Sequence, residues 1–236
     1  MTDKALEGKT ALVTGASRGI GAATALALAA RGAHVILTAR TAGGLEEVEE
    51  AIFAAGGSAT IAPMDLTEND SIARLAEAIS GRWAALDILV LNAAQLGTLS
   101  AVPAIDFKEY AKVLTLNVTA QAAILAAFDP MLKASDGARV IGVTSSVGRN
   151  ARAYWGVYGS SKAAFENLLL TYAEEVAHIS KTRVAIVDPG ATRTKMRARA
   201  FPGEDPSTVK APEVVAERIA ALAASGFDAG HFERVD

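Results

Sequence analysis

Short apolar runs recur along the chain, separated by longer stretches with helical patterns. Most runs are continuous rather than alternating and are rich in Val, Ile and Leu, which is typical of strands covered on both faces. They predict strands at 10–14, 34–38, 58–62, 88–91, 138–143, 183–187 and 231–235.

The stretches between these runs predict helices at 19–31, 44–55, 69–83, 106–134, 158–180 and 212–224. Alternating strands and helices with short loops are typical of a parallel sheet with right-handed crossovers. We therefore expect a single α/β domain over residues 1–236, with a doubly wound parallel sheet of about seven strands flanked by helices. Ligands in such a sheet bind beyond the carboxyl ends of its strands.

Composition narrows the possible functions. The 236 residues carry a net charge of −3, so there is no global basic field to attract nucleic acid. The chain has no cysteine and only three isolated histidines (His34, His178 and His231), which gives no indication of a metal site. Residues 1–9 have no apolar core of a signal peptide, and the longest apolar run, 20–30, is shorter than a membrane span. We expect a cytoplasmic protein with no membrane partner.

The first run leads into Thr14-Gly-Ala-Ser-Arg-Gly-Ile-Gly21, which opens an alanine-rich stretch. This arrangement predicts a strand, a glycine turn and a helix. Bare backbone N–H groups at a helix N-terminus bind a pyrophosphate. An ordinary glycine turn is the alternative, but the flanking strand and helix favour a nucleotide site.

A second motif, Tyr158-Gly-Ser-Ser-Lys162, places a lysine one helical turn after a tyrosine. An ammonium group there stabilises a phenolate, so we expect Lys162 to lower the pKa of Tyr158 and make it a usable proton donor. Together, the two motifs indicate hydride and proton transfer.

These motifs, in this order, resemble the short-chain dehydrogenase/reductase family over about residues 9–212. The resemblance also depends on Asp65-Leu66, Leu91-Asn-Ala-Ala94, Asn117, Ser145 and Pro189-Gly-Ala-Thr-Arg-Thr194. It implies a Rossmann-type fold that binds a nicotinamide cofactor and acts on a small carbonyl or alcohol substrate, in a homodimer or homotetramer.

The resemblance implies a set of cofactor-binding residues. Besides Tyr158 and Lys162, they are Gly15, Ser17, Arg18, Gly19, Ile20, Gly21, Arg40, Asp65, Leu66, Asn92, Ala93, Pro189, Gly190, Thr192 and Thr194. Ala94 replaces the glycine of the family's Asn-Ala-Gly segment, and it fits there only if its φ is not positive. Asp65 would accept a hydrogen bond from the adenine, although a helix N-cap is an alternative role.

The end of the second strand bears on the choice between NAD and NADP. Relatives that prefer NAD carry an acid where this chain has Ala39, and Arg40 follows. Arg40 and Arg18 suit a 2′-phosphate, which guanidinium groups bind bidentately. We expect NADP as cofactor, with two ordinary surface arginines as the alternative.

The resemblance implies that Ser145, Tyr158, Lys162 and Asn117 are the catalytic residues. Family spacing favours Ser145 over Ser146, because it lies thirteen residues before Tyr158 and three before Gly148. Ser145 would hold the substrate oxygen as charge builds on it. Asn117 would mark a helix irregularity that binds a water connecting Lys162 to solvent.

Residues 193–211 combine prolines, glycine and charges, which suits a loop that folds over a substrate. Four cations there (Arg193, Lys195, Arg197 and Arg199) either bind an anionic substrate or form a solvated face. We predict an NADP(H)-dependent oxidoreductase of a carbonyl or alcohol. The alternative is a nucleotide-binding sensor or scaffold, which would not need Ser145.

Overall fold

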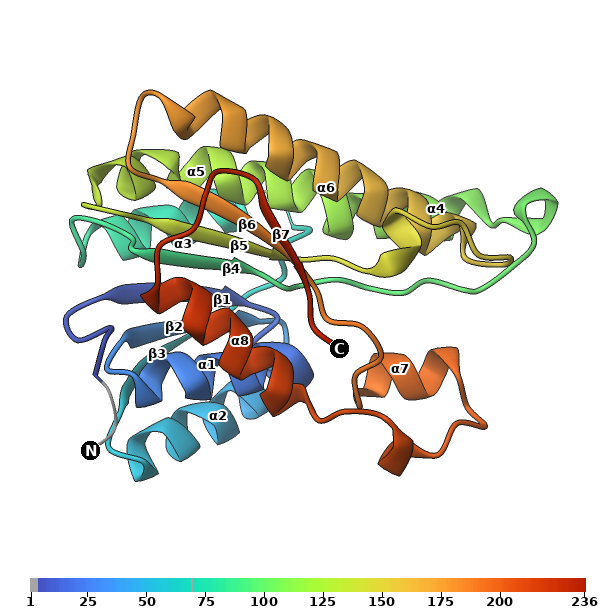
Figure 1. Cartoon of the computed structure of the whole chain (residues 1–236), viewed down its shortest axis with the longest axis horizontal. Coiled ribbons are helices and arrows are strands. Elements are labelled where there is room, and N and C mark those ends of the chain that lie inside the picture. The colour runs from blue at the N-terminus through green and yellow to red at the C-terminus, as the bar shows by residue number, and fades with distance from the viewer. Residues whose placement is uncertain (1–3, 69) are drawn as a thin grey trace.

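The computed structural model describes residues 4–68 and 70–236. Seven parallel strands form one sheet in the order β3-β2-β1-β4-β5-β6-β7 (Figure 1). The strands are β1 (Thr10–Thr14), β2 (His34–Ala39), β3 (Ser58–Pro63), β4 (Ile88–Leu91), β5 (Arg139–Val143), β6 (Arg183–Asp188) and β7 (His231–Arg234). The predicted doubly wound α/β fold is therefore confirmed, and its strand order reverses between β1 and β4.

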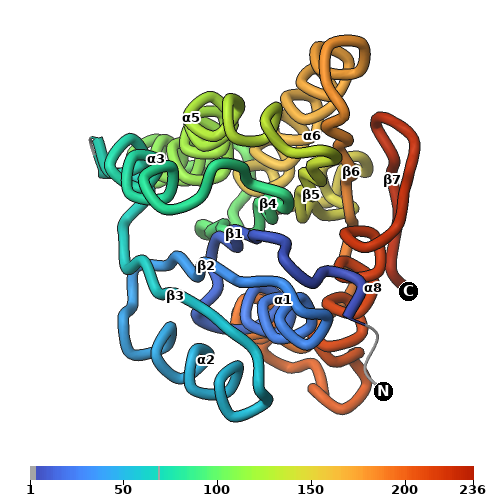
Figure 2. Tube along the Cα trace, turned by 90° about the vertical axis from the view of Figure 1, so that its left-hand side faces the viewer, coloured from blue at the N-terminus to red at the C-terminus, as the bar shows by residue number. Residues whose placement is uncertain are grey.

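Helices cover both faces of the sheet (Figures 1 and 2). One layer contains α1 (Gly19–Ala30), α2 (Ala42–Ala54) and α8 (Pro212–Ala224), and the other contains α3 (Ser71–Ser80), α4 (Phe107–Leu114), α5 (Ala120–Ala134) and α6 (Gly156–Ala177). A short helix, α7 (Lys195–Ala200), lies outside both layers near the C-terminus.

Each strand sends alternate side chains into two separate cores. In β1, Ala11 and Val13 belong to the core shared with α1, α2 and α8, whereas Leu12 belongs to the core shared with α3, α5 and α6. All three residues are fully buried, as expected for a strand covered on both faces.

Within the described part of the chain, one continuous helical stretch, Phe107–Ala134, has the length and apolarity of a membrane-crossing helix. Its side chains Ile124, Phe128 and Leu132 are fully buried in the core beneath it. This stretch therefore packs as a core helix of the α/β layers.

Several element bounds differ from those predicted. The helix predicted over 69–83 begins at Ser71 and ends at Ser80, and Asn69 lies outside the described residues. The helix predicted over 106–134 is interrupted by a π-helical turn at Thr115–Thr119. The loop predicted over 193–211 contains α7, which the Thr194 hydroxyl caps by accepting from the backbone N–H of Arg197 at 3.1 Å.

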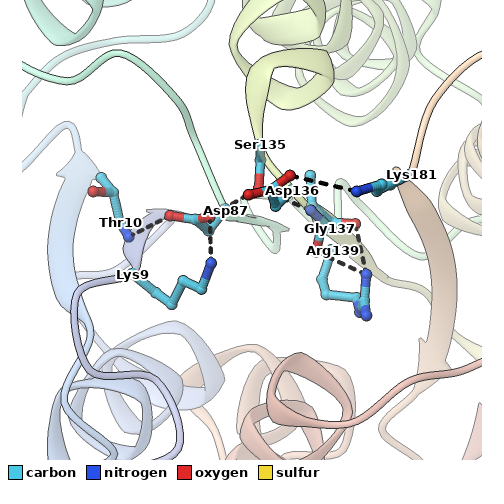
Figure 3. A network of polar contacts seen from close by, with 9 residues as sticks. Lys9, Thr10, Asp87, Ser135, Asp136, Gly137, Arg139 and Lys181 are labelled. Atoms are coloured by element: carbon cyan, nitrogen blue, oxygen red, sulfur yellow. Dashed lines mark hydrogen bonds and ion pairs between the residues drawn. The ribbon is translucent and has the colours of Figure 1, made fainter.

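A polar cluster joins the amino ends of inner strands, at the end of the sheet opposite the motifs (Figure 3). The carboxylate of Asp87, just before β4, accepts from Lys9 Nζ (3.1 Å), Thr10 N (3.0 Å) and Ser135 Oγ (2.8 Å). These donors lie at the start of β1 and in the segment before β5. The cluster is therefore a structural anchor for the starts of β1, β4 and β5.

Candidate active site

The glycine turn and the segment after β4 meet where the strand order reverses. Thr14 Oγ1 accepts from the backbone N–H groups of Asn92 (2.9 Å) and Ala93 (3.0 Å). Asn92 Nδ2 in turn donates to Thr14 O (2.9 Å) and Gly15 O (3.2 Å). A Cβ on Gly21 would lie 2.2 Å from Gly15 O, so this turn closes only without a side chain there. Asn92 thus clamps the turn onto β4.

The start of α1 fits a bound pyrophosphate. Its N-cap residue, Arg18, provides no side-chain hydrogen bond to the helix, so the first backbone N–H groups remain available to a ligand. Gly19 adopts φ +58°, and a Cβ on it would lie 3.4 Å from Thr194 Cγ2. The turn before α1 and the segment after β6 therefore face each other across the expected phosphate site, with Ser17 and Ile20 half-buried beside it.

The ends of β2 and β3 bring Arg40 close to Asp65. Burial would raise the pKa of the Asp65 carboxyl, but hydrogen bonds from Thr67 and the charge of Arg40 outweigh this effect and lower it. Asp65 Oδ1 accepts from both Thr67 N (2.9 Å) and Thr67 Oγ1 (2.7 Å), so its side chain closes a local turn. Arg40 is exposed, as is Arg18, while Ala39 and Leu66 are buried. As expected, Ala39 puts no acid at the end of β2, but the segment after β3 places the Asp65 carboxylate near Arg40, which the sequence did not predict.

Asn117 lies in the π-helical turn and is 1% exposed. Its Oδ1 accepts from Gln95 N (2.9 Å), and its Nδ2 donates to Gln95 O (2.9 Å) and Ser161 Oγ (3.0 Å). The expected helix irregularity at Asn117 is therefore present. It joins the segment after β4 to α6 beside Tyr158.

Ser145 lies where the chain leaves β5 and precedes a short 3₁₀ turn, Ser146–Gly148. This turn packs on α6: a Cβ on Gly159 would lie 2.8 Å from Val147 O, and a Cβ on Gly148 would lie 3.1 Å from the backbone of Lys162. The turn carrying both candidate serines thus contacts α6 at the tyrosine and lysine positions.

Tyr158 and Lys162 are buried, with exposures of 7% and 3%. Burial raises the pKa of the Tyr158 phenol, and the nearby charge of Asp188 raises it further. Burial also lowers the pKa of Lys162 to about 8, an effect that Glu166 opposes. Lys162 Nζ donates to Val143 O at 2.8 Å and lies 5.8 Å from the centre of the Tyr158 ring. The expected lowering of the Tyr158 pKa is wrong for the chain alone, since burial dominates and the ammonium binds a carbonyl.

The segment after β6 leads into α7, which packs against the apolar cluster that contains Tyr158. Thr192 is buried and donates through Oγ1 to Pro189 O at 2.9 Å, and Gly190 adopts φ +59°. Trp155 packs edge-on against Tyr158, with 6.0 Å between ring centres, and its ring is tilted against that of Phe201, the residue after α7, at 5.7 Å. The predicted lid is therefore in contact with the candidate proton donor through Trp155.

The four cations of the predicted lid differ in their contacts and exposure. Arg197 forms a two-point ion pair with Glu204, at 2.6 Å for Nε–Oε2 and 2.5 Å for Nη2–Oε1, and stacks on Phe201. Arg193, Lys195 and Arg199 are exposed. One of the four cations is thus part of the lid's own structure.

Sequence reasoning missed three polar residues of this region: Thr14, Glu166 and Asp188. Thr14 connects β1 to β4, while Glu166 and Asp188 are carboxylates with exposures of 5% and 3%. A signal for Glu166 was available, since a charged residue one turn after Lys162 on a buried helix face calls for a partner.

Comparisons with known proteins agree with this arrangement. The family model described as short chain dehydrogenase matches residues 9–205. The oxidoreductase YciK of Escherichia coli K12, itself uncharacterized, is 36% identical over 210 residues, covering 88% of this chain and 82% of that protein.

Solved structures show the same fold. A short chain dehydrogenase from Shigella flexneri has a TM-score of 0.93 at 33% identity, covering 99% of this chain and 92% of that one. A structure from Escherichia coli CFT073 in complex with NADPH also has a TM-score of 0.93 at 33% identity, covering 100% of this chain and 99% of that one. The sequence and structural matches together show that this chain belongs to the short-chain dehydrogenase family of oxidoreductases.

Proposed function

We propose that this protein transfers a hydride between NADP(H) and a small carbonyl or alcohol substrate, with Tyr158 as the proton donor. The observation that carries the proposal is the packing of the Ser145 turn onto α6 where Tyr158 and Lys162 lie one helical turn apart. A protein that only bound the nucleotide would not need this group of polar residues.

The preference for NADP is supported by the charges around the end of β2. Arg18 and Arg40 are exposed, and Ala39 leaves no acid at the end of that strand. The family member crystallised with NADPH has the same fold. When bound, the cofactor would supply or accept the hydride; the glycine turn and the start of α1 would hold its phosphates, and residues 189–194 would hold its nicotinamide part.

The remaining roles belong to the side chains of this chain. Ser145 donates to the substrate oxygen and stabilises the charge that builds on it. Tyr158 gives its proton to that oxygen, and the charge of Lys162 stabilises the phenolate that is left. Asn117 fixes the π-helical turn next to Ser161 and Gln95, which keeps a path for proton resupply.

The proposal is tested by assaying NADPH oxidation on a carbonyl panel of acetoacetyl thioesters, diketones and quinones. We expect Tyr158→Phe to lose about two to four orders of magnitude in kcat, the range for one positioned acid, and to keep NADPH affinity. Ser145→Ala should lose a similar amount, and Ser146→Ala should lose little. Tyr154→Phe is the matched control, because Tyr154 is 64% exposed.

The outcomes separate the proposal from the alternative of a sensor or scaffold. If no compound turns over while NADPH still binds, the nucleotide-binding alternative replaces the enzyme. If Ser146→Ala is damaging and Ser145→Ala is mild, the assignment of the serine is refuted.

We also propose that the protein is a cytoplasmic homodimer or homotetramer. The support for an oligomer is a groove of about 340 Å³ between α5 and α6, in which apolar side chains such as Leu125, Leu168 and the 68% exposed Ile179 lie beside the charged Asp129, Lys133 and Glu175. Light scattering on the purified protein measures the number of subunits.

A further inference from the structure

Glu166 is a buried carboxylate that the proposed reaction does not use. It lies on α6 one helical turn after Lys162 and is 5% exposed. Thr144 Oγ1 donates to its Oε1 at 2.6 Å, and Arg149 Nε donates to its Oε2 at 2.6 Å. Each oxygen therefore has its own donor, and the carboxylate is fixed in one orientation.

The donors to Glu166 are themselves fixed. Thr144 is 2% exposed and directly precedes Ser145. The Arg149 guanidinium stacks on the ring of Phe232 in β7, with its central carbon 3.4 Å from the ring centre. The carboxylate is therefore connected to the end of β5 and to the last strand of the sheet.

Lys162 needs a countercharge because it is buried. Its Nζ donates to Val143 O and lies 5.0 Å from the centre of the Phe165 ring. Both contacts favour an ammonium, but neither partner carries a negative charge that would offset the hydration lost on burial. Glu166 is the charged group that opposes this effect. The other acid in the region, Asp188, acts on Tyr158 from the end of β6.

We propose that Glu166 is a positioning residue whose carboxylate, held by Thr144 and Arg149, keeps buried Lys162 charged beside Tyr158. The inference rests on the proposed function, because the charge of Lys162 matters to the reaction only if Tyr158 donates the proton. It assigns Thr144 and Arg149 tasks as well: both hold the turn that carries Ser145, and the positive charge of Arg149 offsets part of the effect of the carboxylate on Lys162.

Glu166→Gln tests the proposal through the pH dependence of kcat. The amide keeps the size of the side chain and removes its charge, so the pH above which reduction is lost should fall by about one unit or more. The loss of activity should be about twofold near pH 7 and approach about tenfold above pH 8. Glu174→Gln, on the exposed side of the same helix, should leave the profile unchanged. An unchanged profile in Glu166→Gln overturns the proposal.

A direct titration of Lys162 separates this inference from the proposed function. In protein labelled with ¹³C at the lysine ε-carbons, the signal that disappears in Lys162→Arg reports the protonation of Lys162. Its midpoint, about 8 in the unchanged protein, should fall in Glu166→Gln whether or not any substrate turns over. If the unchanged protein turns over no compound while the midpoint still falls in Glu166→Gln, the proposed function is refuted and the effect of Glu166 on the Lys162 charge stands.

Arg149→Gln provides a second variant that does not depend on Glu166→Gln folding. The Arg149 side chain is 40% exposed, so its loss is easier to tolerate. Without its ion pair, the Glu166 charge acts on Lys162 unopposed, and the Lys162 midpoint should rise instead of fall. A midpoint that stays the same in Arg149→Gln overturns the proposal.

Discussion

Gly21, the third glycine of the motif, lies in the first turn of α1 and has no room for even one methyl group. A Cβ there would lie 2.2 Å from Gly15 O and 2.5 Å from Asn92 Nδ2, whereas real Cβ contacts stay beyond 3.0 Å. In Gly21→Ala the Gly15 carbonyl must move outward and Asn92 must give up its two hydrogen bonds, at 2.9 and 3.2 Å. Overpacking of this kind costs about 1–3 kcal/mol, and each lost hydrogen bond costs about 0.5–1.5 kcal/mol.

The preference of a helix for alanine over glycine offsets about 1 kcal/mol of that cost. We therefore expect Gly21→Ala to lower the free energy of unfolding by about 1–3 kcal/mol and to weaken NADPH binding, because the displaced atoms belong to the phosphate turn. Urea unfolding and NADPH fluorescence titration measure the two effects.

Gly43→Ala is the matched control for Gly21→Ala. Gly43 lies in α2, and a Cβ there would meet nothing within 4 Å. This variant should gain about 0.5–1 kcal/mol with unchanged NADPH affinity. If Gly21→Ala and Gly43→Ala change the free energy of unfolding and the NADPH affinity by similar amounts, the close packing at Gly21 does not hold the phosphate turn in shape.

Two further predictions concern the cofactor and the structural anchor. Arg40 should make NADPH preferred over NADH by at least about tenfold in kcat/KM, because a charge-assisted bond contributes about 1.5–3 kcal/mol, and added salt should weaken the preference. Ala39→Asp with Arg40→Ala should reverse the order, whereas equal use of both cofactors by the unchanged protein refutes the assignment. Asp87→Ala should lower the free energy of unfolding by about 1–3 kcal/mol in urea, since three donors lose their acceptor. Asp136→Ala, with a 96% exposed side chain, should change it by less than about 0.5 kcal/mol, and equal losses in both variants would contradict the anchor role.

The five inner strands were predictable because they are buried on both faces and therefore apolar along most of their length, whereas the edge strands β3 and β7 are only partly buried. All seven strands match the predicted ranges within one residue at each end. The helix ends were harder to predict. Asp70, with φ +59°, precedes α3, and α6 begins at Gly156, two residues before the predicted start. The conformation of local turns sets where these helices begin and end, and the periodicity of apolar residues carries no information about it.

Contacts between distant segments account for what the sequence did not predict. Asp65 approaches Arg40 only because β3 pairs with β2, in a register that sets Ala39 beside Pro63. The lid forms a helix because Met196 and Ala200 pack against the cluster around Tyr158. No spacing within the chain encodes either contact.

Burial moves the pKa values of Tyr158 and Lys162 in opposite directions, and this difference favours distinct roles for the two groups. The phenol, buried and near the Asp188 carboxylate, holds its proton more tightly than an exposed tyrosine, which is the state a donor needs before reaction. The amine, lowered to about 8, is charged at neutral pH but close to losing its proton. Environments that push two pKa values apart identify which group holds the proton and which responds to its transfer. We infer that Tyr158 stores the proton, and that the Lys162 charge acts when the buried phenolate forms.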